Sequence, residues 1–302
     1  MHHKGLIITL VIVILIGGSF LLGMAIYFLR SGDTESSASL FGTKRVGVIT
    51  VEGTILSSND TLRDLEKFRK NDDIKSIILR IESPGGSVAA SQEIFEAVKR
   101  VSKDKPIIAS MGALAASGGY YIACAANEIF ANPGTTTGSI GVRIEHIMIG
   151  DLMKWAKIEH ETLKSGKLKD LMPFDKPISP EARKILQGML DEIHVQFKDA
   201  VAKSRGIDRK ELDKIADGRI FTGEQAKTLG LIDTLGGFTE AALKAAQLAG
   251  IEGYPKLVYP KKHYDMIERM FSEIKSLISG KAANGLVVPQ PMLLMQTFST
   301  SI

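Results

Sequence analysis

The sequence predicts an α/β protein in which helices cover both faces of a parallel sheet. Its apolar runs at 74–81 and 106–109 are nearly continuous, which is typical of strands buried on both faces. Helical segments alternate with such runs, and this order produces parallel strands joined by crossover helices. Glycine-rich turns follow both runs, at 82–87 and 110–119. Because such sheets place their sites at the carboxyl ends of strands, we expect the functional residues in these turns.

The other elements are predicted from caps, turns and hydrophobic period. Asn59 caps a helix to about residue 69, and Asp208 caps a short one. Ser179 and Pro180 begin a long helix to about 203, since serine is a favoured cap and proline fits the first helical position. Strands are predicted at 46–51, 74–81, 106–109, 128–131, 160–163, 217–223 with its turn, and 231–233. Further helices are predicted at 87–101, 120–127, 224–229, 239–249 and 264–278, and a polar turn at 135–141.

An uncharged stretch of 25 residues, 5–29, lies near the N-terminus. As a helix it is about 37 Å long, enough to cross a bilayer with some tilt. It is longer than the apolar core of a cleavable signal peptide, and the residues at its end make a poor cleavage site. We therefore expect an uncleaved, single-pass membrane anchor at 1–30, followed by a flexible polar tether at 31–43. The flanking lysine and arginine nearly balance, so the charges alone do not set the orientation.

We divide the rest of the chain into a single folded domain at 44–280 and a mobile tail at 281–302. Composition excludes several classes of function for it. The net charge is +4, and no basic stripe with interleaved aromatic residues is present, so nucleic acid is not an expected partner. Cys124 is the only cysteine, which excludes an intrachain disulfide. No cluster of His, Cys, Asp and Glu has metal-ligand spacing, so we expect no metal and no cofactor.

Ser117 is the candidate nucleophile. It stands between a predicted strand and a predicted helix, in a turn with Gly118 and Gly119. A serine at such a turn exposes its hydroxyl, and the N–H groups at the helix start can hold an anion. A turn that simply contains a small residue is the alternative interpretation.

A serine nucleophile needs a base, and the residues alone leave its identity open. His146 and His160 are nearest in sequence, but neither lies in a glycine-rich turn or beside an evident acidic partner. A neutral lysine is the other known partner for serine. Three lysines, Lys164, Lys167 and Lys169, crowd one loop, which by itself is also typical of a solvated surface.

The segment GALAASGGYYIA at 112–123 resembles the nucleophile segment of the signal peptide peptidase A family of membrane-anchored S49 serine proteases. Double-length members of that family carry two copies of the fold, and this chain, with one copy, resembles the short members. SPGG at 83–86, TGSIGV at 137–142, KSGKLKD at 164–170 and ADGR at 216–219 resemble that family in the same order. The resemblance covers about 44–249. It implies a ClpP/crotonase-like fold, Ser117 as nucleophile and Lys169 as base. It also implies an oxyanion hole at Gly86 and Gly118, with the Ser139 hydroxyl orienting the lysine.

The resemblance further implies a membrane-anchored endopeptidase that cleaves apolar peptides such as released signal peptides, with its catalytic domain outside the cytoplasm. Short members of the family form rings in which the serine and lysine of one site come from neighbouring copies, so this chain is expected to need a homo-oligomer. Three alternatives stay open: a crotonase-like acyl-CoA enzyme, a stomatin-associated membrane protease and a catalytically inactive membrane scaffold.

Overall fold

The computed structural model describes residues 44–261. The predicted anchor and tether, the helix expected at 264–278 and the expected tail at 281–302 lie outside the described residues. Among the helices of the described range, none combines the length and the apolar character that a membrane crossing needs.

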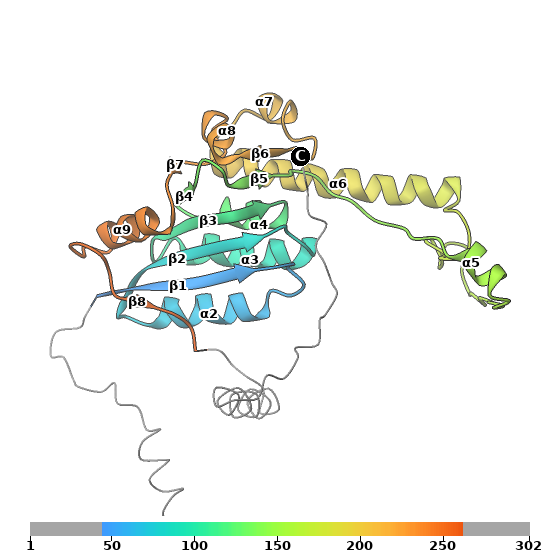
Figure 1. Ribbon diagram of the computed structural model, residues 1–302, viewed down its shortest axis with the longest axis horizontal. Coiled ribbons are helices and arrows are strands. Elements are labelled where there is room, and N and C mark those ends of the chain that lie inside the picture. The colour runs from blue at the N-terminus through green and yellow to red at the C-terminus, as the bar shows by residue number, and fades with distance from the viewer. Residues whose placement is uncertain (1–43, 262–302) are drawn as a thin grey trace, which may run out of the picture. The chain divides into compact units, whose positions relative to one another are not determined.

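Eight strands in the described residues form one sheet (Figure 1). Its main path runs β6-β5-β3-β2-β1-β8, and β4 pairs with both β3 and β7. Neighbouring strands are parallel, as predicted, except for the antiparallel pair of β5 and β6. The strands are β1 Arg45–Glu52, β2 Ile74–Ser83, β3 Ile107–Ala116, β4 Glu128–Ala131, β5 Thr136–Gly138, β6 Ile220–Thr222, β7 Thr234–Leu235 and β8 Leu257–Val258.

Helices cover both faces of this sheet. On one face α2 packs against β1 and β2 and α4 against β2 and β3, with α3 beside both helices; on the other, α9 packs against β1, β2 and β3 (Figure 1). Ser179 caps α6 and Asp208 caps α7, as predicted. The helices are α2 Asn59–Lys70, α3 Val88–Val101, α4 Gly118–Ala123, α5 Gly150–Trp155, α6 Pro180–Arg205, α7 Arg209–Asp213, α8 Gly223–Thr228 and α9 Phe238–Leu248.

The core lies on both faces of the sheet, which explains the continuous apolar strand sequences. In β2, Ile77 and Leu79 belong to the larger core cluster, on the face covered by α2 and α4, whereas Ile78 belongs to the cluster under α9. Side chains of a strand alternate between its faces, so a strand that is buried on both sides is apolar at most positions instead of at every second one. The fold class predicted from these runs is confirmed.

Strand β3 changes partners half-way along its length. Its first half pairs with β2 and β4, and after Met111 its register against β2 jumps, so that Ser83 lies opposite Ala115. The residues beyond the jump pair with β5. Glu82 holds this bend, because its carboxylate accepts a hydrogen bond from the Ala113 N–H at 2.8 Å. The glycine and alanine residues that predict a turn from 110 therefore form the second half of a strand.

Some predicted boundaries were wrong. Residues 160–163 form no strand; they lie exposed in a loop, where the His160 ring packs edge-on against Phe174 at 4.5 Å. The strand predicted at 231–233 begins only at Thr234, and α4 ends earlier than predicted. The polar turn at 135–141 contains β5, and the elements α5 and β8 were not predicted. These errors fall on short segments whose structure depends on distant partners.

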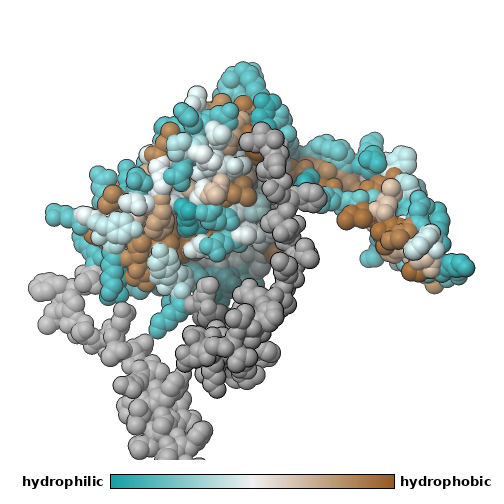
Figure 2. Space-filling view, viewed as in Figure 1, coloured by the Kyte–Doolittle hydropathy of each residue, from teal (hydrophilic) through white to brown (hydrophobic). Residues whose placement is uncertain are grey.

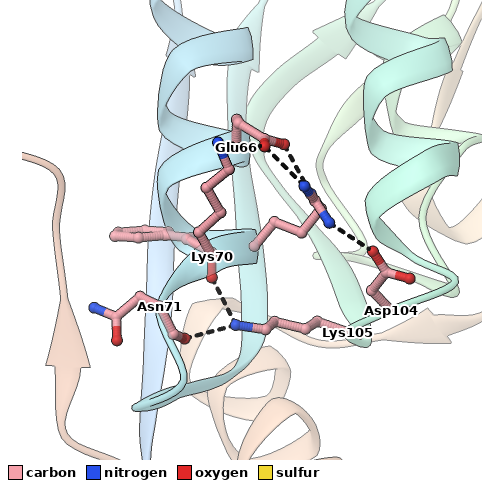
Figure 3. A network of polar contacts seen from close by, with 7 residues as sticks. Glu66, Lys70, Asn71, Asp104 and Lys105 are labelled. Carbon is pink, nitrogen blue, oxygen red and sulfur yellow. Dashed lines mark hydrogen bonds and ion pairs between the residues drawn. The ribbon is translucent and has the colours of Figure 1, made fainter.

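A polar network fixes the C-terminal end of α2 (Figure 3). Glu66 accepts two hydrogen bonds from the Arg69 guanidinium, at 2.7 and 2.8 Å, and pairs with Lys70 at 3.1 Å. Lys105, which precedes β3, donates to the carbonyl oxygen of Asn71 at 2.6 Å. Hydrogen bonds from Arg69 and Lys70 hold the pKa of Glu66 at about 2.

Between β5 and α6 the chain leaves the sheet. We call residues 142–178 the arm; it contains α5 and runs beside α6 away from the strands (Figure 1). Apolar side chains are exposed along it (Figure 2). Those at least half exposed are Ile147, Met148, Leu152, Trp155, Ile158 and Leu163.

Candidate active site

A cleft of about 820 Å³ opens at the carboxyl ends of β2, β3 and β5. The turn Pro84-Gly85-Gly86 lines one side, and Ser139, Gly141 and Val142 line another, with Ser117 between them. The turns that the sequence singles out thus meet in one place. An apolar pocket of about 30 Å³ adjoins Ser117. Its walls include Val142 together with Tyr121 and Phe197, whose rings pack edge to face at 4.9 Å.

Ser117 stands at a sharp turn between β3 and α4. Its φ of 52° lies in the left-handed region, which residues other than glycine, asparagine and aspartate rarely adopt. The turn is held by hydrogen bonds on both sides: the Ser117 N–H donates to Gly138 O at 2.9 Å, and its carbonyl accepts from Tyr121 N–H at 2.8 Å. Strained backbone of this kind recurs at serine nucleophiles, where it lifts the hydroxyl above the sheet.

Two backbone N–H groups beside Ser117 are free to bind an anion. A Cβ added to Gly118 would lie 3.3 Å from the Gly86 nitrogen, so the two glycines are neighbours. Gly86 forms an isolated β-bridge with Ile55. The two hydrogen bonds of this bridge run from Ile55 N–H to Gly85 O and from Ser87 N–H to Ile55 O, so neither uses the Gly86 N–H. Within residues 44–261, neither the Gly86 nor the Gly118 N–H donates to another protein group. Paired donors next to a nucleophile form an oxyanion hole.

Larger residues do not fit the turn that carries one of these donors. Gly85 has a φ of +96°, and a Cβ there would lie 2.6 Å from the Gly118 nitrogen. A Cβ at Gly86 would lie 2.2 Å from Ile55 O. The glycines of the SPGG segment are therefore required by close backbone packing as well as by the turn.

Ser139 follows β5 and lines the same cleft as Ser117. Its φ of 53° is also left-handed, and its N–H donates to Arg219 O at 2.8 Å. The Arg219 guanidinium binds the Asp217 carboxylate at 2.8 and 2.5 Å, which holds the pKa of Asp217 at about 2. The ADGR segment thus supports the Ser139 turn from the outside.

Lys169 lies elsewhere within a single chain. It is exposed on the arm and is not among the residues that line the cleft. Two positions earlier, Lys167 pairs with Glu181 in the first turn of α6 at 2.5 Å. The first residue of α6 that lines the site is Ile193, twelve residues later, or about 18 Å along the helix axis. Ser117, Gly86, Gly118 and Ser139 come together in one copy, whereas Lys169 does not join them.

The histidine that lines the cleft was not singled out in the sequence analysis. His194, on α6, lines the cleft and contacts Ile140 O through Nε2 at 3.1 Å. The two histidines considered as bases are instead arm residues, and His146 bonds Pro173 O at 2.7 Å. The sequence did contain a signal for His194: it lies three and seven positions before the buried Phe197 and Val201, so helical spacing places it on the inward face of α6.

The described residues contain no group of three His, Cys, Asp or Glu side chains placed to hold a metal ion. What the cleft offers is the half-buried Ser117 with its hydroxyl at a strained turn, two free amide donors beside it and a small apolar pocket. This arrangement suits nucleophilic attack on a carbonyl group followed by stabilisation of the oxyanion.

Comparison with known proteins agrees with this chemistry. Residues 99–252 match Peptidase family S49, and residues 33–137 match the family described as Clp protease. The chain is 40% identical over 212 residues to the Synechocystis protein named "Putative protease slr0021", covering 69% of this chain and 76% of that one. It is 34% identical to "Serine protease SPPA, chloroplastic" of Arabidopsis thaliana, over 68% of this chain and 30% of that one.

A third relative is "Putative signal peptide peptidase SppA" of Enterococcus faecium, which is 36% identical over 66% of this chain and 62% of its own length. The family match spans half of the chain and includes α4, β5 and the whole arm. The Ser117 turn and the two free N–H donors beside it lie in the part that the structure describes. The chain therefore belongs to Peptidase family S49 and is a serine protease with an α/β, ClpP-like fold.

Proposed function

We propose that this protein is a membrane-anchored endopeptidase in which Ser117 and Lys169 form a catalytic dyad, and that it cleaves apolar peptides such as released signal peptides. The observation that carries the proposal is the strained Ser117 turn with two free N–H donors, at Gly86 and Gly118, in one cleft. No partner for Ser117 other than a lysine is favoured by the family segments. The resemblance of KSGKLKD at 164–170 supports Lys169 as that lysine.

In this mechanism Ser117 Oγ attacks the peptide carbonyl while Lys169 Nζ, in its neutral form, takes the hydroxyl proton. The negative charge moves to the carbonyl oxygen, which accepts hydrogen bonds from the Gly86 and Gly118 N–H groups. The C–N bond then breaks, and Lys169 returns the proton to the leaving amine. A water molecule, deprotonated by Lys169, then attacks the acyl-enzyme ester; the ester bond to Ser117 Oγ breaks, Lys169 returns the proton to Oγ, and the second product leaves as a carboxylic acid. Each oxyanion donor contributes roughly 3 kcal/mol to transition-state stabilisation in other serine proteases.

The lysine of each site comes from a neighbouring copy. The position of Lys169 supports this part of the proposal: it is exposed on the arm, and Lys167, two residues earlier, pairs with Glu181, about 18 Å along α6 from the first residue of that helix that lines the site. The arm around it exposes large apolar side chains, among them Trp155 at 82% and Leu163 at 88%. Exposed apolar surface on this scale is typical of a protein interface. A head-to-tail contact of arm and cleft that repeats through rotation closes into a ring.

The pocket beside Ser117 supports small apolar side chains at the cleavage site. Its volume of about 30 Å³ leaves room for little more than a methyl group, and Val142, Tyr121 and Phe197 make it apolar. The Enterococcus faecium relative is named as a signal peptide peptidase, which supports released signal peptides as substrates of this chain. The uncharged stretch at 5–29 would keep the domain beside such membrane-derived peptides, on the extracytoplasmic side.

Substitution of each dyad residue tests this proposal. Ser117→Ala and Lys169→Ala should each abolish hydrolysis of an Ala-rich peptide and labelling by a fluorophosphonate probe, with an unchanged melting temperature. Lys164→Ala is the matched control, since it removes an exposed lysine from the same loop, and should keep most of the activity. Retained activity in Lys169→Ala, with loss in His194→Ala or His146→Ala, would mean that the base is a histidine.

Anchoring and orientation are tested separately on intact cells. Full-length protein should stay in the membrane after alkaline carbonate extraction, whereas a chain that starts at Lys44 should not. Added protease should digest the domain in spheroplasts without lysis. Digestion that requires lysis would place the domain in the cytoplasm instead.

A further inference from the structure

Residues 138–140 are held by hydrogen bonds from separate parts of the chain. The Ser117 N–H donates to Gly138 O at 2.9 Å, and the Ser139 N–H donates to Arg219 O at 2.8 Å. Both of these bonds join backbone to backbone. The third bond comes from a side chain, because His194 on α6 reaches Ile140 O at 3.1 Å.

The chemistry of this third bond fixes the state of the His194 ring. A carbonyl oxygen can only accept a hydrogen bond, so Nε2 carries a proton and donates it. The Ile140 side chain is fully buried in the core, and the His194 ring is half-buried beside Ser117 and Ser139 in the cleft. The bond therefore links α6 to the residue next to Ser139, at the wall of the site.

After Ile140 the chain makes few backbone hydrogen bonds. Within residues 44–261, no backbone N–H of residues 141–148 donates a hydrogen bond to the protein, and the next one to do so is that of Ile149, to Phe174 O inside the arm. His194 thus makes the last hydrogen bond between the body of the domain and the chain that leaves for the arm. The left-handed turn of Ser139 lies directly before this point.

We propose that His194 is a positioning residue for catalysis: by donating from Nε2 to Ile140 O it holds the Ser139 turn so that the Ser139 hydroxyl can orient the base. This inference rests on the proposed function, in which Ser139 orients Lys169. Small displacements of orienting groups lower the turnover number strongly, by as much as about 100-fold for an ångström. Loss of the bond should therefore lower kcat and leave KM nearly unchanged.

Two amide substitutions of His194 form a matched test in the full-length protein. In His194→Gln the amide N–H stands about as far from the backbone as Nε2 and can still reach Ile140 O. In His194→Asn it is one methylene shorter and cannot. We expect kcat of the Asn variant to fall roughly 10- to 100-fold and kcat of the Gln variant to stay within about threefold of the wild type. His194→Leu should behave like the Asn variant.

The control is Asp191→Asn, an exposed α6 residue that accepts a hydrogen bond from Gln187 at 2.7 Å and should have no effect on kcat. Melting temperatures of all variants show whether each is folded. Equal kcat values for folded Gln and Asn variants, or a loss confined to KM, would overturn the positioning role. If Lys169→Ala is inactive at the same time, only this inference fails; if Lys169→Ala is active, the proposed dyad fails.

Discussion

Mixing two inactive variants gives the most decisive measurement of the shared site. Ser117→Ala chains keep Lys169, and Lys169→Ala chains keep Ser117, so a contact between them can join an intact serine to an intact lysine. In a random 1:1 assembly each site takes its serine from one chain and its lysine from the next. The chance that both are intact is one half times one half, so about a quarter of wild-type activity should return.

A second mixture distinguishes a site shared between two chains from a dyad within one chain. When wild type is co-assembled 1:1 with the Ser117→Ala/Lys169→Ala double variant, a shared site again leaves about a quarter of the sites intact. A dyad within one chain predicts different values, namely no activity in the first mixture and about half in the second. The assay is the initial rate of peptide hydrolysis at fixed total protein after co-expression. Rates of zero and one half would refute the placement of Lys169 in a neighbour's site.

Three further predictions concern the pocket, the oxyanion hole and stability in acid. Phe197→Leu should widen the small pocket, so that a leucine before the cleaved bond is accepted better than in the wild type. In matched peptides the kcat/KM ratio of leucine over alanine should rise by about tenfold or more, since one methylene in such a pocket changes kcat/KM by roughly 10- to 200-fold. An unchanged ratio would mean that this substrate side chain does not bind in the pocket. Gly86→Ala, whose Cβ would lie 2.2 Å from Ile55 O, should displace one oxyanion donor and lower kcat by about 100- to 1,000-fold with little change in KM. The pKa of Glu66 is lowered from 4.5 to about 2 in the folded protein, so its contribution to stability is fully present above pH 4.5 and is lost as pH falls towards 2. Denaturant titrations of wild type and Glu66→Gln should therefore differ at neutral pH and converge near pH 2, and a constant difference across that range would contradict the assignment.

The sheet and the sharp turn at Ser117 could be predicted because their signals are local. Continuous apolar runs show burial on both faces, and glycines beside Ser117 show a tight turn, whatever surrounds them. The second half of β3 could not be predicted, because a small-residue segment becomes a strand only when β5 is there to pair with it. The false strand at 160–163 is the reverse case, a β-like sequence to which the arm offers no partner.

The site itself was predictable only in part, for the same physical reason. Ser117, Gly86, Gly118 and Ser139 each lie in a recognisable turn, and topology brings those turns together. His194 is separated from Ile140 by 54 positions, and only the helix packing shows that the two residues meet. Lys169 has no local signal beyond its loop of lysines, and its proposed partner lies on another copy of the chain.

The bend in β3 lies between two parts of the proposed catalytic centre. Beyond Glu82 and Ala113, β3 keeps one pairing with β2, between Ser83 and Ala115, and otherwise pairs with β5, which pairs with β6, so that Ser117 and Ser139 both adjoin this three-stranded ribbon. Gly86 does not belong to that ribbon, since it continues from β2 and is pinned to Ile55. A tilt of the ribbon about the bend would keep the two serines in register and change the gap between Ser117 and the Gly86 amide. In the proposed mechanism, such a tilt would change the fit of the oxyanion to the Gly86 donor and would leave the alignment of Ser117 with Ser139 unchanged.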